Sequence, residues 1–225
     1  MSERFVSTIA AITAELQRRP RDAETLGLLA RGLRWQRSVD AEDLAALERL
    51  LELIRRKQGP GCWDVERAVL EIFCERAGAE HIQMLTNIFR QSAERHGNDR
   101  RRLSLQALSG VAARTGNADA LRVLEEGLHH VKKDTRGWAI GFLVGSYESL
   151  GHPLPQSALD RLRFLMNHDT SPDIRVEAVT ALAELGLVDL ATVAAVVAAA
   201  GDKRSAGDGL PHSKKSRKRL RSSHD

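Results

Sequence analysis

A chain of 225 residues with 42% hydrophobic side chains is long enough to bury a sizeable core. Only 4% of the residues are aromatic, and the chain is rich in Leu, Ala, Arg and Glu, which are good helix formers. Alternating runs of Val, Ile and Thr are missing, so the composition argues against a β-sheet and predicts an all-α fold.

The net charge of +4 is unevenly distributed along the chain. Residues 204–225 contain seven Lys or Arg and two Asp, which gives +5 and leaves −1 for residues 1–203. This C-terminal segment is rich in Ser and Gly and has almost no apolar residues, so we expect it to be disordered when alone. The sequence therefore predicts a helical domain at 1–203 and a flexible basic tail at 204–225.

The cysteines and apolar runs bear on the cellular compartment. Cys62 and Cys74 form no C-x-x-C pair and have no nearby histidine cluster, so free thiols are expected, with no metal site and no cofactor. The N-terminus lacks the basic region of a signal peptide, and the apolar run at 190–201 is too short to span a bilayer. These features predict a soluble cytoplasmic protein, or a nuclear one if the source is eukaryotic.

Helical segments separated by short breaks rich in Gly, Pro, Asn and Asp run from the N-terminus to about residue 200. Each break offers a capping Gly, Asp or Ser, or a Pro at a helix start. The predicted hairpins pair 3–18 with 23–36, 41–57 with 63–77, 79–95 with 100–115, 118–130 with 134–150, and 156–167 with 173–185, followed by a cap helix at 188–200.

A short pattern recurs in the second helix of these hairpins. The stretch HDTSPDIRVEAVTALAELG, at 168–186, contains D-x-R-x-x-A-x-x-x-L. The copies, each 35 to 39 residues from the next, are Asp173, Arg175, Ala178, Leu182; Asp134, Arg136, Ala139, Leu143; Asp99, Arg101, Ser104, Leu108; and the weaker Asp64, Glu66, Val69, Phe73. We expect the Asp to cap its helix, the small residue to allow close helix approach, and the large residue to fill the core. Such a period predicts a two-helix solenoid.

At these residues the chain resembles the HEAT-repeat family. The similarity is closest in the fifth hairpin, where Asp169, Pro172, Arg175, Val176 and Ala178 look like the family's turn and second helix, and it covers roughly residues 60–200. The resemblance implies a right-handed α-solenoid of about five hairpins plus the cap helix. It also implies a ladder between repeats, made by an Asp in the turn and an Arg six residues later, a spacing that Asp169 and Arg175 fit.

Glycines recur every four residues in GWAIGFLVGSY, at 137–147. Each glycine inside a helix costs about 0.5–1 kcal/mol relative to Ala, so the stripe needs a reason. Aligned repeats place polar residues at the same level, which favours the concave inner face and a protein partner held there. The predicted protein-binding residues are Trp138, Gly141, Gly145, Leu103 and Gln106. The alternative is that another helix of the same chain fills the stripe.

Basic residues cluster at two predicted helix starts one repeat apart, in NDRRRLS and KKDTR, and again in the tail. Stacking would align the first two clusters into a basic edge suited to phosphates. The predicted nucleic-acid-binding residues are Arg100, Arg101, Arg102, Lys132, Lys133 and Arg136, with Lys214, Lys215, Arg217, Lys218 and Arg219 in the tail. The alternatives are locally paired or solvated charges on the edge and a solubilising tail.

Catalytic motifs such as H-E-x-x-H, G-x-S-x-G and the P-loop do not occur. Trp63 and Asp64 resemble the W-D-x-x-D arrangement of bacterial HEAT-like DNA glycosylases, but Arg67 stands at the second Asp position and Glu66 is one residue out of step. The sequence therefore predicts a protein that is not an enzyme: a scaffold or adaptor for a protein partner, with no membrane contact. The alternatives are a nucleic-acid-binding module and, third, a glycosylase-like repair enzyme.

Overall fold

The computed structural model describes residues 3–18, 22–34, 39–57, 59–91 and 96–207. Within these ranges the chain is all-helical and contains no strand, as the composition predicts. The helices are α1 (Glu3–Gln17), α2 (Ala23–Arg34), α3 (Ala41–Lys57), α4 (Cys62–Arg76), the short 3₁₀ helix η1 (Ala79–His81), α5 (Ile82–Gln91), α6 (Gly97–Thr115), α7 (Ala118–Gly127), α8 (Lys133–Leu150), α9 (Gln156–His168), α10 (Pro172–Glu184) and α11 (Leu190–Gly207).

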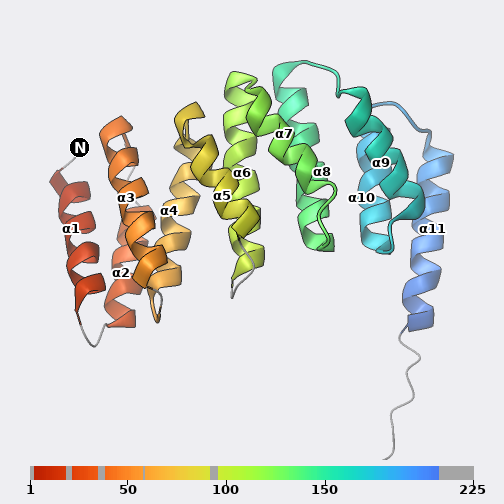
Figure 1. The fold of residues 1–225 in the computed structure, drawn as a ribbon. Coiled ribbons are helices and arrows are strands. Elements are labelled where there is room, and N and C mark those ends of the chain that lie inside the picture. Colours follow the sequence, from red (N-terminus) through yellow and green to blue (C-terminus); the bar gives the residue numbers. More distant parts are fainter. Residues whose placement is uncertain (1–2, 19–21, 35–38, 58, 92–95, 208–225) are drawn as a thin grey trace, which may run out of the picture.

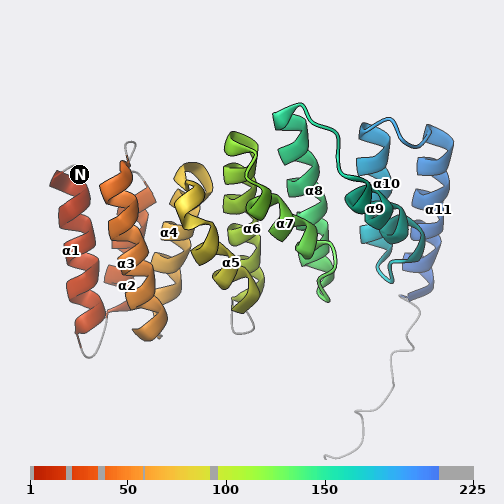
Figure 2. The same ribbon diagram turned by 45° about the horizontal axis from the view of Figure 1, so that its top comes forward.

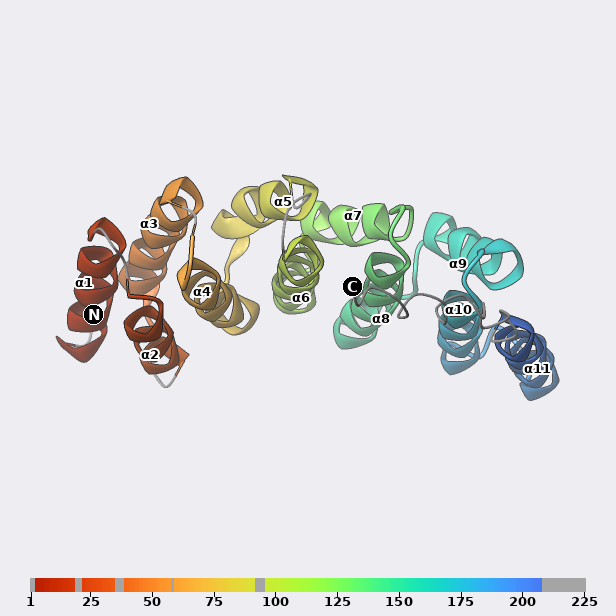
Figure 3. The same cartoon turned by 90° about the horizontal axis from the view of Figure 1, so that it is seen from below.

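The helices follow one another along a single axis, from α1 at one end to α11 at the other (Figure 1). The same order is visible after a 45° turn (Figure 2). Seen from below, α3, α5, α7 and α9 form one row, and α2, α4, α6, α8 and α10 form a second, with α11 beside α10 (Figure 3). We call the second row the even row. Its members pack on one another in chain order, α2 on α4, α4 on α6, α6 on α8 and α8 on α10.

The core lies between the two rows and along the even row. The repeated small positions and the repeated large positions are all fully buried, and they are Val69, Ser104, Ala139 and Ala178, and Phe73, Leu108, Leu143 and Leu182. At one of them the close approach is direct, because a Cβ placed on Gly127 of α7 would lie 2.7 Å from the Cβ of Ala139 on α8. The repeated pattern therefore marks the residues that let successive helices stack.

The repeated Asp residues do not cap their helices as expected. The N-cap positions are Gly61, His96, Lys132 and Ser171, and the Asp of each copy lies within the first turn. A carboxylate there faces the positive end of the helix dipole, which stabilises the helix without a side-chain cap.

The helix ends agree with the predicted breaks at most positions. Gly116, Gly151 and Gly186 have φ of 64°, 65° and 69°, the left-handed conformation that closes a helix and favours glycine. The predicted helix at 79–95 is instead divided into η1 and α5. The Nδ1 atom of His81 accepts a hydrogen bond from the backbone N–H of Gly78 at 3.1 Å, which closes a turn there. At the other end, α11 continues to Gly207, past the expected boundary at residue 203.

Polar contacts join each hairpin to the next. Arg136 on α8 donates from Nε and Nη2 to the two carboxylate oxygens of Asp169, at 2.7 and 2.8 Å, and both side chains are buried. The Nη1 atom of Arg175 donates to the backbone carbonyl of Asp169 at 2.7 Å. Asp169 therefore pairs with the arginine of the preceding hairpin, and Arg175 holds the turn of its own hairpin.

Candidate functional site

Two parallel stripes of side chains lie on adjacent helices of the even row. One stripe, on α8, comprises Asp134, Trp138, Gly141, Gly145 and Glu148; the other, on α10, comprises Asp173, Glu177, Thr180 and Glu184. Steps of three and four residues place each set on one face of its helix. Because α8 packs on α10, the stripes are neighbours. We call the two stripes together the α8–α10 surface.

The space above the α8 stripe is open. A Cβ on Gly141 or on Gly145 would meet no heavy atom within 4 Å, so no helix in the described part of the chain fills the stripe. Trp138 is half-buried and packs against the core, so its ring is held in place beside the glycines. Gly137 differs, because the carboxylate of Glu177 lies where its Cβ would be. Gly137 thus lets α10 place a carboxylate against α8.

The α8–α10 surface is acidic. It carries five carboxylates, on Asp134, Glu148, Asp173, Glu177 and Glu184. The Nζ of Lys133 lies 3.3 Å from Oδ2 of Asp173. Partial burial raises the pKa of Glu177, and the charge of Asp134 raises it further while Lys133 opposes the shift. No hydrogen bond or ion pair is found for Glu177 among the residues that the structure describes. A cation placed at this surface would therefore be stabilised.

On α6 the predicted surface does not continue. Leu103, predicted to bind a partner, is only 2% exposed and belongs to the core, so it offers no contact surface. The physical reason is register: on α6 the outward position is taken by Arg102, one residue earlier, whose Nη1 lies 3.3 Å from Oε1 of Gln106. Gln106 itself is half-buried. The open part of the even row is therefore α8 with α10.

The first half of the predicted basic edge is engaged in contacts within the chain. Arg100 donates from Nε and Nη2 to both carboxylate oxygens of Glu66, at 2.9 and 2.7 Å. Arg101 is buried, and its Nη2 donates to Oδ1 of Asn98 at 2.7 Å. Arg102 contacts Gln106 as described above. These side chains link α6 to α4 and to their own helix.

The second half of the predicted basic edge, at the start of α8, is also mostly engaged in contacts within the chain. Arg136 is buried in its pair with Asp169, and Lys133 is paired with Asp173. Lys132 is exposed. The tail residues Lys214, Lys215, Arg217, Lys218 and Arg219 lie outside the described residues. The described edge thus corresponds to the alternative of locally paired charges, since five of its six basic side chains are engaged.

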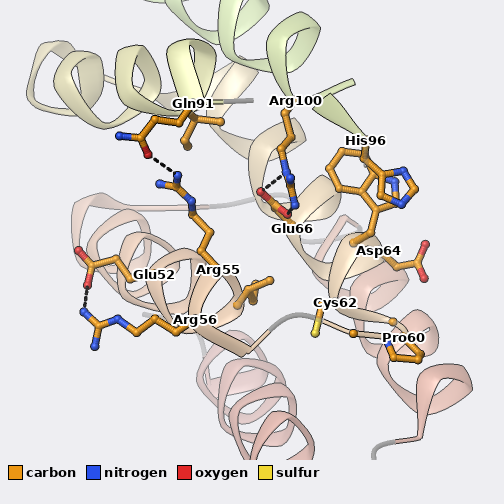
Figure 4. A pocket seen from close by; sticks show the side chains of 15 residues that line it. Glu52, Arg55, Arg56, Pro60, Cys62, Asp64, Glu66, Gln91, His96 and Arg100 are labelled. Atoms are coloured by element: carbon orange, nitrogen blue, oxygen red, sulfur yellow. Dashed lines mark hydrogen bonds and ion pairs between the residues drawn. The ribbon is translucent and has the colours of Figure 1, made fainter. Parts of the chain in front are cut away.

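A cleft of about 1180 Å³ lies where α3 ends, α4 begins and α6 begins (Figure 4). The ring of Trp63 on α4 stacks in parallel on the ring of His96, with 4.6 Å between centroids, and Arg100 lies 5.6 Å from the Trp63 centroid. At the rim, Arg55 donates to Gln91 at 2.9 Å and Arg56 lies 3.8 Å from Glu52.

The cleft contains the residues that resemble the glycosylase motif. Glu66 is buried and both its oxygens accept hydrogen bonds from Arg100, whereas Asp64 is exposed and Arg67 pairs with Glu71 at 2.8 Å. The buried carboxylate is therefore neutralised by a guanidinium. Sequence reasoning found Trp63, Asp64 and Glu66 but missed His96, Arg55 and the Glu66–Arg100 pair. Glu66 and Arg100 are separated by 34 residues, which is close to the repeat period, and this spacing was the signal in the sequence for their pairing.

Three further features of the described residues bear on nucleophilic chemistry, metal binding and membrane insertion. Burial raises the pKa of the Cys74 thiol to about 12, which keeps it protonated and poorly nucleophilic. The described residues contain no group of three or more His, Cys, Asp or Glu placed to hold a metal ion. No helix in the described ranges has the length and apolar character needed to cross a membrane.

Comparisons with protein-family models, with curated proteins and with solved structures find no match to this chain.

Proposed function

We propose that this protein is a non-catalytic scaffold, a HEAT-like α-solenoid that binds a segment of a partner protein on the even row. The solenoid is supported by the stacking of paired helices and by contacts that join residues about one repeat apart. Arg90 pairs with Glu126, 36 residues on, and Arg136 pairs with Asp169, 33 residues on. Stacked helical repeats offer extended surfaces suited to binding other chains.

One observation carries the binding proposal: the open space above Gly141 and Gly145, beside the half-buried Trp138. Both glycines lower helix stability by about 0.5–1 kcal/mol relative to Ala, and neither is needed for packing within the described chain. A smooth helix face lets a partner's backbone approach closely, and a fixed indole ring beside it is a typical anchor for an interface.

The nucleic-acid alternative has less support. Phosphate binding needs cationic groups free to neutralise phosphates, and most of the predicted edge is engaged with carboxylates, amides or carbonyls of the chain itself. The glycosylase alternative is weakened in the same way, because Arg100 neutralises Glu66.

The test is to fill the stripe and measure partner recovery. Gly141→Leu and Gly145→Leu place bulky side chains in the open space without disturbing the core, so both should abolish co-purification of the partner from source cells, measured by quantitative mass spectrometry. Trp138→Ala should weaken recovery. Gly27→Leu is the matched control, because Gly27 also lies inside a helix with no atom within 4 Å of its Cβ, but on α2.

If the same proteins are recovered with the Gly141→Leu chain as with the Gly27→Leu chain, the stripe is not the binding surface. Circular dichroism and thermal unfolding of each variant confirm that the helical fold is kept.

A further inference from the structure

The C-terminal end of α11 lies at the edge of the molecule where α8 and α10 begin. In Figure 1 the lower ends of α8, α10 and α11 share one edge, and α11 packs directly on α10. Asp134 and Asp173 lie in the first turns of α8 and α10, so they are at this same edge, and Glu177 follows one turn later. The chain therefore leaves α11 beside the acidic end of the α8–α10 surface.

The sequence that follows is strongly basic. Residues 214–221, KKSRKRLR, contain six Lys or Arg and no acidic residue. Residues 208–213 separate this segment from Gly207, and the seven Cα–Cα steps from Gly207 to Lys214 span at most about 25 Å. Packed helices lie about 8–10 Å apart, so α10 and α8 are both within reach of the segment.

The charges of the two parts are complementary. Five carboxylates lie on the α8–α10 surface, where Lys133 pairs with Asp173. On α4 and α6, by contrast, Glu71 pairs with Arg67 and Glu66 pairs with Arg100. The pKa of Glu177 is raised by burial and by Asp134, which means that a neighbouring cation would relieve an unfavourable charge.

We propose that the basic segment 214–221 binds in cis to the α8–α10 surface and occupies it when no partner is bound. The inference rests on the proposed function, because the segment competes for the surface assigned to the partner. Tethering makes the effective concentration of the segment about millimolar, so even weak charge pairing suffices for occupancy. The partner must then displace it, so its own binding segment is expected to be basic.

The test is a competition between the tethered segment and a free copy of it. A fluorescently labelled peptide of residues 212–223 is titrated with the full wild-type chain and with a full chain in which the six basic residues at 214–221 are replaced by Gln, and anisotropy is measured at low salt. The neutral-tail chain should bind the peptide about tenfold more tightly, because its own segment no longer competes. Physiological salt should weaken this binding.

The surface is tested in the neutral-tail chain. Glu177→Gln with Glu184→Gln should weaken peptide binding about fivefold or more, because two carboxylates of the surface are removed. Glu42→Gln with Glu52→Gln is the matched control, since both glutamates are exposed but lie on α3 in the other row, and it should leave the affinity unchanged.

Equal peptide affinity for the wild-type and neutral-tail chains, or equal effects of the two double variants, would overturn the inference. Mass that grows with protein concentration in sedimentation velocity, and is lost in the neutral-tail chain, would show exchange between copies and also overturn the cis contact. A partner lost on Gly141→Leu while the peptide does not bind leaves the proposed function standing without this inference. Peptide binding as expected, with no partner lost on Gly141→Leu, would leave the cis contact standing and overturn the proposed function.

Discussion

Helical glycines in this chain fall into two kinds that differ in the space around the missing Cβ. At Gly141 and Gly145 the space is empty, whereas at Gly110 a Cβ would lie 2.8 Å from the backbone oxygen of Cys74, and at Gly127 it would lie 2.7 Å from the Cβ of Ala139. The second kind permits close packing within the chain. Gly141 and Gly145 have no such role within the described helices, and the proposed partner contact would account for their lower helix propensity.

This difference predicts opposite signs for the same substitution. Gly141→Ala and Gly145→Ala should each raise the free energy of unfolding by about 0.5–1 kcal/mol, because a methyl group in open space improves helix propensity. Gly127→Ala should lower it by about 1–3 kcal/mol through overpacking against Ala139. Urea unfolding followed by circular dichroism measures all three, and a destabilising Gly141→Ala would mean that a helix of the same chain packs closely against the stripe.

At the scale of the elements, successive hairpins are joined by ion pairs between polar side chains as well as by the apolar core. Arg136 and Asp169 form the most buried of these ion pairs, with side chains only 10% and 4% exposed. Burying two charges is costly, and the bidentate geometry offsets that cost only while both partners are present. The pair therefore acts as a fixed link between α8 and the turn before α10.

Asp169→Ala should lower the free energy of unfolding by about 3–5 kcal/mol, because it leaves the buried Arg136 guanidinium without its carboxylate. Asp160→Ala is the matched control: Asp160 also pairs with an arginine, Arg163 at 3.1 Å, but both side chains are largely exposed. That exposed pair should contribute less than about 1 kcal/mol. Equal losses in the two variants, measured by urea unfolding, would remove the special role of the Asp169 pair.

The elements themselves could be predicted from the sequence because their boundaries are local. Gly116, Gly151 and Gly186 end helices where the breaks in the apolar pattern placed them, and the repeated small and large residues are all buried. The division at η1 was missed because it depends on one hydrogen bond between Gly78 and His81. The repeat pattern does not fix the rotation of each helix about its own axis to within one residue. It therefore placed Leu103 on the surface, although Leu103 is buried.

The candidate site was predictable only in part for a related reason. The glycines of α8 are visible in the sequence, but whether another helix covers them depends on packing that no local pattern encodes. The partners of Arg100 and Lys133 lie 34 and 40 residues away, and net charge alone does not distinguish a paired arginine from a free one. Charge runs alone therefore do not separate a phosphate-binding edge from a set of locally paired charges.

At the scale of the whole molecule, stability depends on contacts between neighbours along the axis. The main packing that joins α9, α10 and α11 to the rest of the described chain is that of α8 on α10. Two polar links reinforce this junction, the Arg136–Asp169 pair and the hydrogen bonds from Arg161 on α9 to the backbone carbonyl of Leu128. A stack of this kind can open at its weakest junction without unfolding throughout.

The junction predicts a graded pattern of amide hydrogen exchange in the native protein. Amides in the middle of α4, α6 and α8 should exchange most slowly, because these helices have neighbours on both sides, and amides of α9, α10 and α11 should exchange faster and together. Asp169→Ala should speed exchange in α9–α11 by about a hundredfold, which corresponds to a loss of about 3 kcal/mol in the free energy of opening this junction. Exchange in α4 and α6 should change far less. Uniform acceleration along the chain would instead indicate a single cooperative unit, in which the loss of one link is shared by every helix.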